Sequence, residues 1–138
     1  MGVVAVVTQL IYMSEPFGYD ENILATILAT ARRRNERDGI TGALICRHDI
    51  YLQLIEGDEG AIDALFARIL ADDRHLAVTL LSRVEVADRL LPQWAMLHDP
   101  AHTWLWTAEE VASGAVREAT PEALQQVFLR AGAEAASS

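Results

Sequence analysis

Cysteine is almost absent from this sequence, since Cys46 is the only one in 138 residues. A single thiol excludes an internal disulfide, so we expect a reducing, cytoplasmic environment. A run of about 18 apolar residues is also lacking, which argues against a membrane-spanning helix and a membrane partner. The apolar start MGVVAVVTQLIYMSE has neither a basic region nor a small-residue cleavage site. We therefore interpret it as a first strand and not as a signal peptide.

Positive charge is scarce, because 11 basic residues stand against 20 acidic ones and the formal net charge is −9. A nucleic-acid-binding protein needs a basic face for the phosphates, so we expect no nucleic-acid partner. The hydrophobic share of 51% is enough to build the core of one folded domain. No group of residues suggests a metal site.

The order of periodic segments along the chain predicts an α+β fold. Strands are predicted over residues 3–13, 40–47, 50–56 and 78–86, and helices over 20–37 and from the 57–60 turn to residue 70. This β-α-β-β-α-β order is the ferredoxin-like one, a sandwich whose antiparallel sheet carries both helices on one face. A shorter fifth strand is predicted over residues 95–98, after the turn at Pro92.

The last forty residues form an extension with helix-start signals. Thr107 and Glu110 fit a capping box for a short helix that ends at Gly114. Thr120 and Pro121 fit the start of a last helix. We expect these helices to cover the other face of the sheet, as an extension (99–138) to a sensor domain (1–98). The final AGAEAASS has little to bury and is expected to be disordered.

Four polar side chains are predicted to point into the space between the two helices and the sheet. Strand alternation places Tyr12 and Gln53 on one face, while Asn35 ends the apolar stripe of the first helix and Arg68 flanks that of the second. Each has an ordinary explanation by itself: a solvated glutamine, a packing tyrosine, a helix-capping asparagine and an exposed arginine. Together they could bind a flat ligand with polar edges.

Several short motifs occur in an order that resembles a known family. They are LIYMS with Tyr12 and Ser14, RRRNERDGITGAL with Asn35, YLQLIEG with Gln53, ILADDRH with Asp72 and His75, and RLLPQWAM with Trp94 and Met96. Together they resemble the BLUF domains, blue-light sensors that use flavin adenine dinucleotide (FAD), in their short single-domain form. The resemblance covers roughly residues 8–98.

The resemblance implies a light-driven switch and no enzymatic activity. Gln53 would be the switch residue, bonded to the flavin and to Tyr12, and Tyr12 would donate an electron and a proton to the photoexcited flavin. Met96 would belong to the outer part of the network, with Trp94 as its competitor for the place beside Gln53. Alternation along the predicted fifth strand puts Trp94 and Met96 on one face, and we expect both to point toward Gln53. A carboxamide suits this role because it has a strong donor and a strong acceptor that can exchange places.

The resemblance also implies a noncovalent FAD site between the two helices, which FMN or riboflavin could fill after heterologous expression. Asn35 would bond the carbonyl and imide edge of the ring, and Ser14 would belong to the outer network. Arg68, Asp72 and His75 would surround the ring edge and the ribityl chain. We expect the signal to leave through a downstream protein or a change of self-association, and the protein to be a homo-oligomer.

Three departures from the usual family pattern occur, and other classes remain to be distinguished. Tyr51 replaces a usual phenylalanine, Ile55 a leucine, and Leu90-Leu91 an aromatic pair. A flavin redox enzyme would need an acid or base beside the ring, and no such cluster is evident. A ferredoxin-like module without cofactor would expose Gln53. A cysteine-adduct photoreceptor would need a motif that Cys46 lacks, so Cys46 is expected to be inert core.

Overall fold

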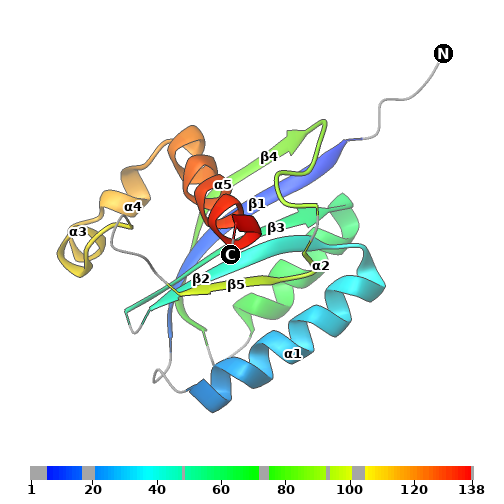
Figure 1. The fold of residues 1–138 in the computed structure, drawn as a ribbon, viewed down its shortest axis with the longest axis horizontal. Coiled ribbons are helices and arrows are strands. Elements are labelled where there is room, and N and C mark those ends of the chain that lie inside the picture. Colours follow the sequence, from blue (N-terminus) through cyan, green and yellow to red (C-terminus); the bar gives the residue numbers. More distant parts are fainter. Residues whose placement is uncertain are drawn as a thin grey trace.

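The computed structural model describes residues 6–16, 21–47, 49–71, 75–92, 94–100 and 105–137. Figure 1 shows the arrangement of the elements, and their order in the chain agrees with the predicted one. They are β1 (Val7–Pro16), α1 (Glu21–Asp38), β2 (Thr41–Arg47), β3 (Ile50–Gly57), α2 (Glu59–Leu70), β4 (His75–Val86), β5 (Leu97–Pro100), α3 (Ala108–Ala112), α4 (Ala115–Glu118) and α5 (Pro121–Ser137).

The strands form a sheet with the order β4-β1-β3-β2-β5. Its first four strands are antiparallel, as the α+β prediction requires. The fifth strand predicted at Ala95–His98 is not seen there. Ala95 and Met96 are irregular, and only the short segment Leu97–Pro100 pairs with β2, in parallel. The cause is that side chains of α1 take the carbonyls of Ala95 and Met96, as described below.

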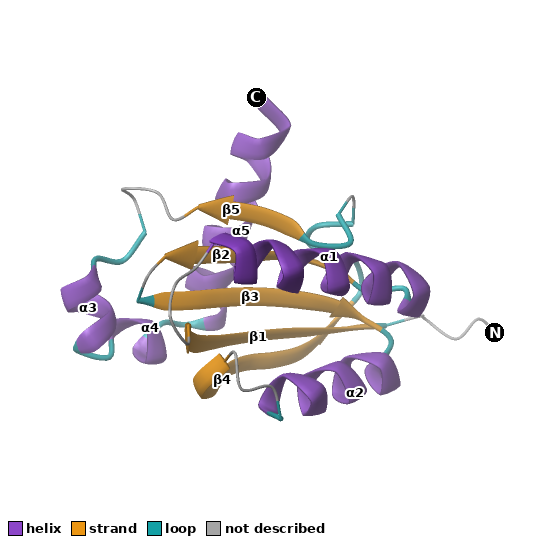
Figure 2. Cartoon of the chain, turned by 90° about the horizontal axis from the view of Figure 1, so that it is seen from below, coloured by secondary structure: helices purple, strands orange, loops and turns teal. Residues whose placement is uncertain are grey.

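The sheet lies between two groups of helices (Figure 2). It separates two apolar cores. We call the face covered by α1 and α2 the helix-pair face, and the opposite one, covered by α3, α4 and α5, the C-terminal face. The core of the helix-pair face includes Leu10, Tyr12, Leu44, Cys46, Tyr51 and Ile55 from the strands and Leu24, Leu28, Ile62, Leu65 and Ile69 from the helices. The core of the C-terminal face includes Ile11, Met13, Ile45, Leu52 and Leu54 from the strands and Val116, Leu124 and Phe128 from the helices.

As predicted, the C-terminal helices cover the face of the sheet opposite α1 and α2. The capping box of α3 is present, since Thr107 Oγ1 accepts from Glu110 N and the Glu110 carboxylate accepts from Thr107 N. The predicted disorder of residues 131–138 is wrong for 131–137, which continue α5. Small residues pack closely there: Ala131 is fully buried, and a Cβ on Gly132 would lie 2.6 Å from Leu91 Cδ2.

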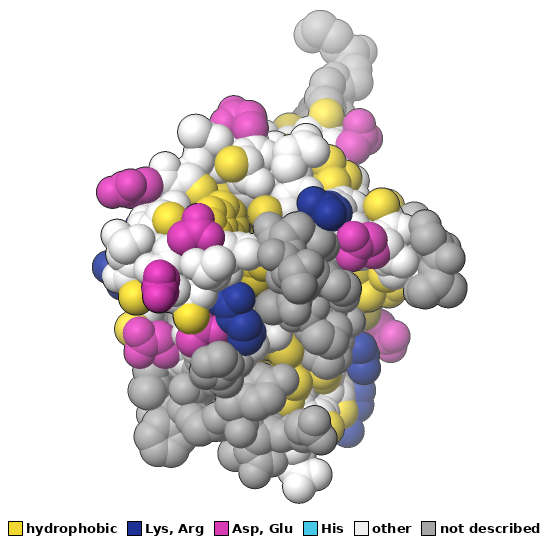
Figure 3. Space-filling model, turned by 60° about the vertical axis from the view of Figure 1, so that its left-hand side comes forward, with side chains coloured by type: hydrophobic (Ala, Val, Ile, Leu, Met, Phe, Trp, Pro, Cys, Tyr) yellow, Lys and Arg dark blue, Asp and Glu magenta, His cyan; other side chains and the backbone are white. Residues whose placement is uncertain are grey.

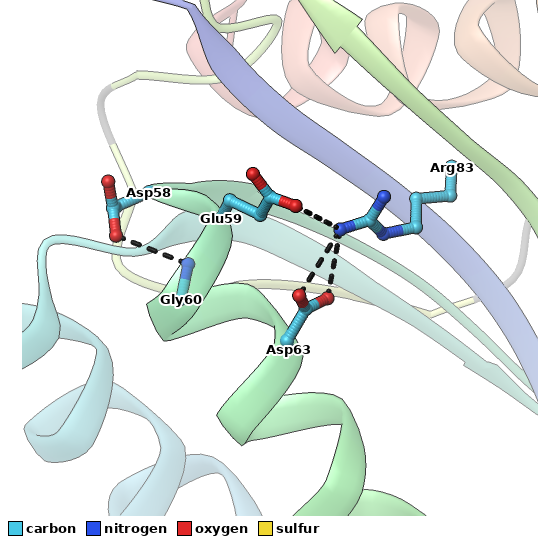
Figure 4. Close-up of polar contacts among 5 residues, drawn as sticks. All are labelled: Asp58, Glu59, Gly60, Asp63 and Arg83. Atoms are coloured by element: carbon cyan, nitrogen blue, oxygen red, sulfur yellow. Dashed lines mark hydrogen bonds and ion pairs between the residues drawn. The ribbon is translucent and has the colours of Figure 1, made fainter.

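Helix α2 is fixed at its start by capping and by a contact with the edge strand β4 (Figure 4). The Asp58 carboxylate accepts from Gly60 N at 3.2 Å. The Arg83 guanidinium on β4 bonds Asp63 at 3.0 Å and Glu59 at 3.3 Å. Hydrogen bonds to the Asp63 and Glu59 carboxylates raise the pKa of Arg83 above its usual value. These contacts tie the outer edge of the sheet to the first turn of α2.

On the face drawn in Figure 3, the acidic side chains that are visible are scattered and do not form one patch. Among the described residues, none of the helices combines the length and apolar character that a bilayer crossing requires. The same part of the chain contains no cluster of three or more His, Cys, Asp or Glu residues placed to hold a metal ion.

Candidate functional site

Tyr12 and Gln53 meet on the helix-pair face, as strand alternation predicted. They are direct neighbours across the antiparallel β1–β3 pair. The Tyr12 hydroxyl donates a hydrogen bond to Gln53 Oε1. Tyr12 is fully buried and Gln53 is only 7% exposed, so the solvated-glutamine explanation does not hold. The Tyr12 ring also packs on Phe66 of α2, with 5.7 Å between the ring centroids.

Met96 completes the surroundings of Gln53, whereas Trp94 does not. Gln53 Nε2 donates to Met96 Sδ at 3.4 Å, and Met96 is buried in the core of the helix-pair face. Trp94 packs instead against the core of the C-terminal face, where its ring lies near Gly132. The expectation that Trp94 points toward Gln53 is therefore wrong in this structure. Residues 94–96 are irregular, so the alternation rule that placed both side chains on one face does not apply.

Side chains of α1 hold the backbone that carries Met96. Asn35 Nδ2 donates to the Ala95 carbonyl at 2.7 Å, and Arg32 Nε donates to the Met96 carbonyl at 3.1 Å. Gly42 N donates to the preceding carbonyl, that of Trp94, at 3.0 Å. Arg32 was not among the predicted site residues. Its position, one turn before Asn35 on the same helix, was the available signal.

Asn35 provides a direct test of whether the site fits a flavin. It is 1% exposed, and its Oδ1 has no hydrogen-bond donor among the described residues. A buried carbonyl oxygen without a donor is costly, so a ligand that supplies one is expected at this point. The edge of a flavin ring carries an imide N–H beside carbonyl oxygens. The unsatisfied oxygen of Asn35 therefore fits the imide N–H of such a ring.

The other site residues predicted from the sequence divide into three groups. Ser14 is fully buried on the strand that carries Tyr12, and its predicted role stays a prediction. Arg68 is partly exposed and lies 3.6 Å from the Asp38 carboxylate at the end of α1. The Arg37 guanidinium beside Asp38 is the main reason why the pKa of that carboxyl lies below its usual value. Asp72 and the side chain of His75 lie outside the described residues.

Comparison with known families identifies the region that contains this site. A family model described as "BLUF: Sensors of blue-light using FAD" matches residues 7–97. The photoactivated adenylate cyclase subunit beta of Euglena gracilis is 35% identical over 74 residues, which are 53% of this chain and 9% of that protein. The alpha subunit of the same organism is 33% identical over 91 residues, again 9% of its length. The chain thus spans about a tenth of the curated relatives that it matches.

Two solved structures have the same fold over nearly the whole chain. The photo-activated state of BlsA superposes with a TM-score of 0.75 at 21% identity and covers 91% of this chain and 94% of that one. The dark-state structure of BlrB, described as a BLUF protein, superposes with a TM-score of 0.67 at 27% identity and covers 97% and 92%. Both likenesses extend beyond residue 97 and so include C-terminal helices.

Proposed function

Because the chain belongs to the BLUF family of blue-light sensors, whose domains bind FAD or FMN, we propose that Gln53 is its light-operated switch. The observation that carries the proposal is the continuous contact from the Tyr12 hydroxyl through the Gln53 carboxamide to Met96 Sδ. In the proposed lit state the carboxamide has exchanged its donor and acceptor ends. Its hydrogen bonds to the flavin differ as a result, although no covalent bond has changed.

Asn35, Gln53 and Tyr12 would hold the flavin. When bound, the flavin supplies blue-light absorption and, once excited, a strong electron acceptor. Tyr12 suits the role of donor because its phenol can release an electron and a proton together. Its hydroxyl is already bonded to the Gln53 carboxamide, which gives the proton a defined path. The burial of both residues keeps water out of this exchange.

The contact with Met96 contributes little to the preference of Gln53 for one orientation. A thioether sulfur is a weak acceptor, so the NH₂ group loses little when it turns away from Met96. The carbonyl end gains or loses a much stronger partner, the Tyr12 hydroxyl. The state of Tyr12 can therefore decide the orientation of Gln53. Light would act on Tyr12, and Gln53 would follow.

The signal is proposed to leave through the residues beside Met96. Met96 touches Gln53 on the helix-pair face, and Trp94 touches the α5 region on the opposite face. A shift of this short segment would therefore be felt by the C-terminal helices. The proposed output is a downstream protein or a change of self-association in a homo-oligomer. Size-exclusion chromatography in darkness and under blue light tests the second route.

The test of the switch is the substitution Gln53→Leu. The variant should bind flavin and lose the reversible red shift of the absorption spectrum under blue light, because leucine offers neither donor nor acceptor. Gln126→Leu, an exposed glutamine on α5, is the matched control and should shift normally. A full red shift in the Gln53→Leu protein would remove Gln53 from the mechanism.

Spectra of the unmodified protein separate the proposed function from the alternatives. Bound oxidised flavin would rule out a module that works without cofactor. A reversible red shift without bleaching would rule out both a cysteine adduct and a redox enzyme. Cys46 gives no support to the adduct class, since it is 2% exposed within an apolar core. Loss of the flavin absorption band under light would contradict the proposal.

A further inference from the structure

A buried carboxylate occupies the C-terminal face of the sheet, away from the flavin site. Glu56 on β3 is fully buried. Its oxygens accept from the backbone N–H of Leu90 at 2.8 and 2.9 Å and from that of Leu91 at 3.1 Å. These two residues precede Trp94 and Met96 in the connection between β4 and β5. Glu56 thus holds this connection on the face opposite Gln53, beside Arg89, whose guanidinium donates to Thr41 Oγ1 and to the carbonyls of Glu56 and Gly39.

A second buried carboxamide, Gln9 on β1, bonds the same carboxylate. Gln9 is 1% exposed and lies directly opposite Glu56 in the β1–β3 pair. Its Nε2 donates to Glu56 Oε2 at 3.1 Å. An ionised carboxylate only accepts hydrogen bonds, so Glu56 fixes which end of Gln9 faces it. The carbonyl end of Gln9 must then point the other way, where it needs a donor.

Helix α5 supplies that donor. Gln125 Nε2 donates to Gln9 Oε1 at 2.9 Å. Gln125 lies outside residues 7–97, the part that matches the family, so it belongs to the C-terminal extension of this chain. A continuous chain of hydrogen bonds therefore runs from α5 through Gln9 and Glu56 to the backbone of Leu90 and Leu91. Each link orients the next one.

We propose that Gln125, Gln9 and Glu56 form a buried relay through which the docking of α5 sets the position of residues 90–91, and through them that of Met96. Gln9, Glu56 and Gln125 act as positioning residues. If α5 moves away, Gln9 Oε1 loses its donor, and the Gln9 carboxamide is held less firmly in the orientation that bonds Glu56. The effect on the switch rests on the proposed function, whereas the relay itself does not. Linkage is reciprocal, so a light-driven shift of Met96 would also weaken the docking of α5.

The relay is tested with Gln125→Glu, which keeps the shape of the side chain and removes the donor. Hydrogen exchange of the Leu90 and Leu91 amides in darkness should become about threefold to tenfold faster, the range expected for the loss of one hydrogen bond. Flavin content should stay unchanged. The return of the red-shifted state to the dark spectrum should accelerate by a similar factor, a readout that a merely structural role would not move.

Two matched variants make the result decisive. Gln126→Glu introduces the same charge one residue along, on the exposed side of α5, and should leave all three readouts unchanged. Gln125→Lys keeps a donor and should behave as the unmodified protein. The proposed relay would be wrong if the Leu90 and Leu91 amides exchanged equally fast in the Gln125→Glu and Gln126→Glu proteins. It would also be wrong if these amides exchanged as fast in Gln125→Lys as in Gln125→Glu. Faster exchange with an unchanged return rate would overturn its coupling to the switch. A missing red shift in the unmodified protein would instead contradict the proposed function.

Discussion

Two tyrosines share the helix-pair face, and the hydroxyl of Tyr12 donates a hydrogen bond to Gln53. Tyr12 and Tyr51 are both buried, and they stand two strand positions apart across β1 and β3. Tyr12→Phe should bind flavin and fail to form a stable red-shifted state, because it loses the hydroxyl that bonds Gln53 Oε1. Tyr51→Phe should switch almost normally. Light-minus-dark absorption spectra of both variants check this, and an inactive Tyr51→Phe beside an active Tyr12→Phe would reverse the assignment.

Ala77 adopts a backbone conformation that is unfavourable for alanine. Its φ is +50°, in the left-handed region, within the edge strand β4. Ala77→Gly should raise the free energy of unfolding by about 1 kcal/mol, because the left-handed conformation strains any residue with a Cβ. Ala67→Gly is the control, since Ala67 is an exposed alanine inside α2 and should lose about 1 kcal/mol. Urea unfolding curves of the two variants should therefore move in opposite directions.

At the scale of elements, the contact between β2 and β3 depends on one glycine. A Cβ on Gly42 would lie 2.0 Å from the Leu54 backbone oxygen, and backbone cannot move aside as a flexible side chain can. Gly42 N also bonds the Trp94 carbonyl. Gly42→Ala should therefore destabilise the fold by about 3 kcal/mol or more, with loss of flavin binding.

Gly39 provides the comparison for this prediction. It has a φ of +69°, but a Cβ there would meet nothing within 4 Å. Gly39→Ala should cost only about 1–2 kcal/mol, the strain of the left-handed conformation. Urea denaturation measures both variants, and equal losses would show that the close approach of Gly42 to Leu54 is not the limiting contact.

Periodicity predicted most elements because each main strand and helix buries a regular stripe. The four long strands and the two long helices were found from such stripes, and both C-terminal helix starts from their capping residues. Helix α4 was not predicted, and two stretches were assigned wrongly. Residues 95–96 were assigned to a strand, although side chains of α1 hold their carbonyls. Residues 131–137 lack large apolar side chains, so their close packing as small residues left no periodic signal.

At the scale of the whole molecule, the two faces of the sheet should respond to light together. Hydrogen exchange in matched dark and lit samples should change over residues 92–98 and in the helix that begins at Pro121. Both segments should change because Met96 contacts Gln53 on one face of the sheet and Trp94 contacts the α5 region on the other. Helix α1 should change much less away from Asn35. Equal protection of both C-terminal segments in darkness and light would direct attention to α1 and α2 as the output surface.

The site was predictable where it lies on regular elements and unpredictable where it does not. Tyr12 and Gln53 lie on two paired strands, so alternation placed them correctly on one face, and the role of Asn35 stays a prediction. Trp94 lies in an irregular segment and was assigned to the wrong face. The hydrogen-bond partners of Glu56 could not be predicted, because every residue except proline has a backbone N–H and the sequence does not show which ones face a carboxylate. Only the folded loop shows that Leu90 and Leu91 present theirs to a carboxylate.

The position of β1 in the sheet affects how the protein is made in the cell. β1 is synthesised before every other strand, yet it lies between β3 and β4, with Thr8 beside Gly57 and Val7 beside Val86. Its second neighbour does not exist until β4 has left the ribosome. The β2–β3 hairpin can form early from local contacts, whereas β1 must wait with its apolar residues uncovered. The strand that carries the tyrosine of the switch therefore completes its pairing only after residues 75–86 have been synthesised.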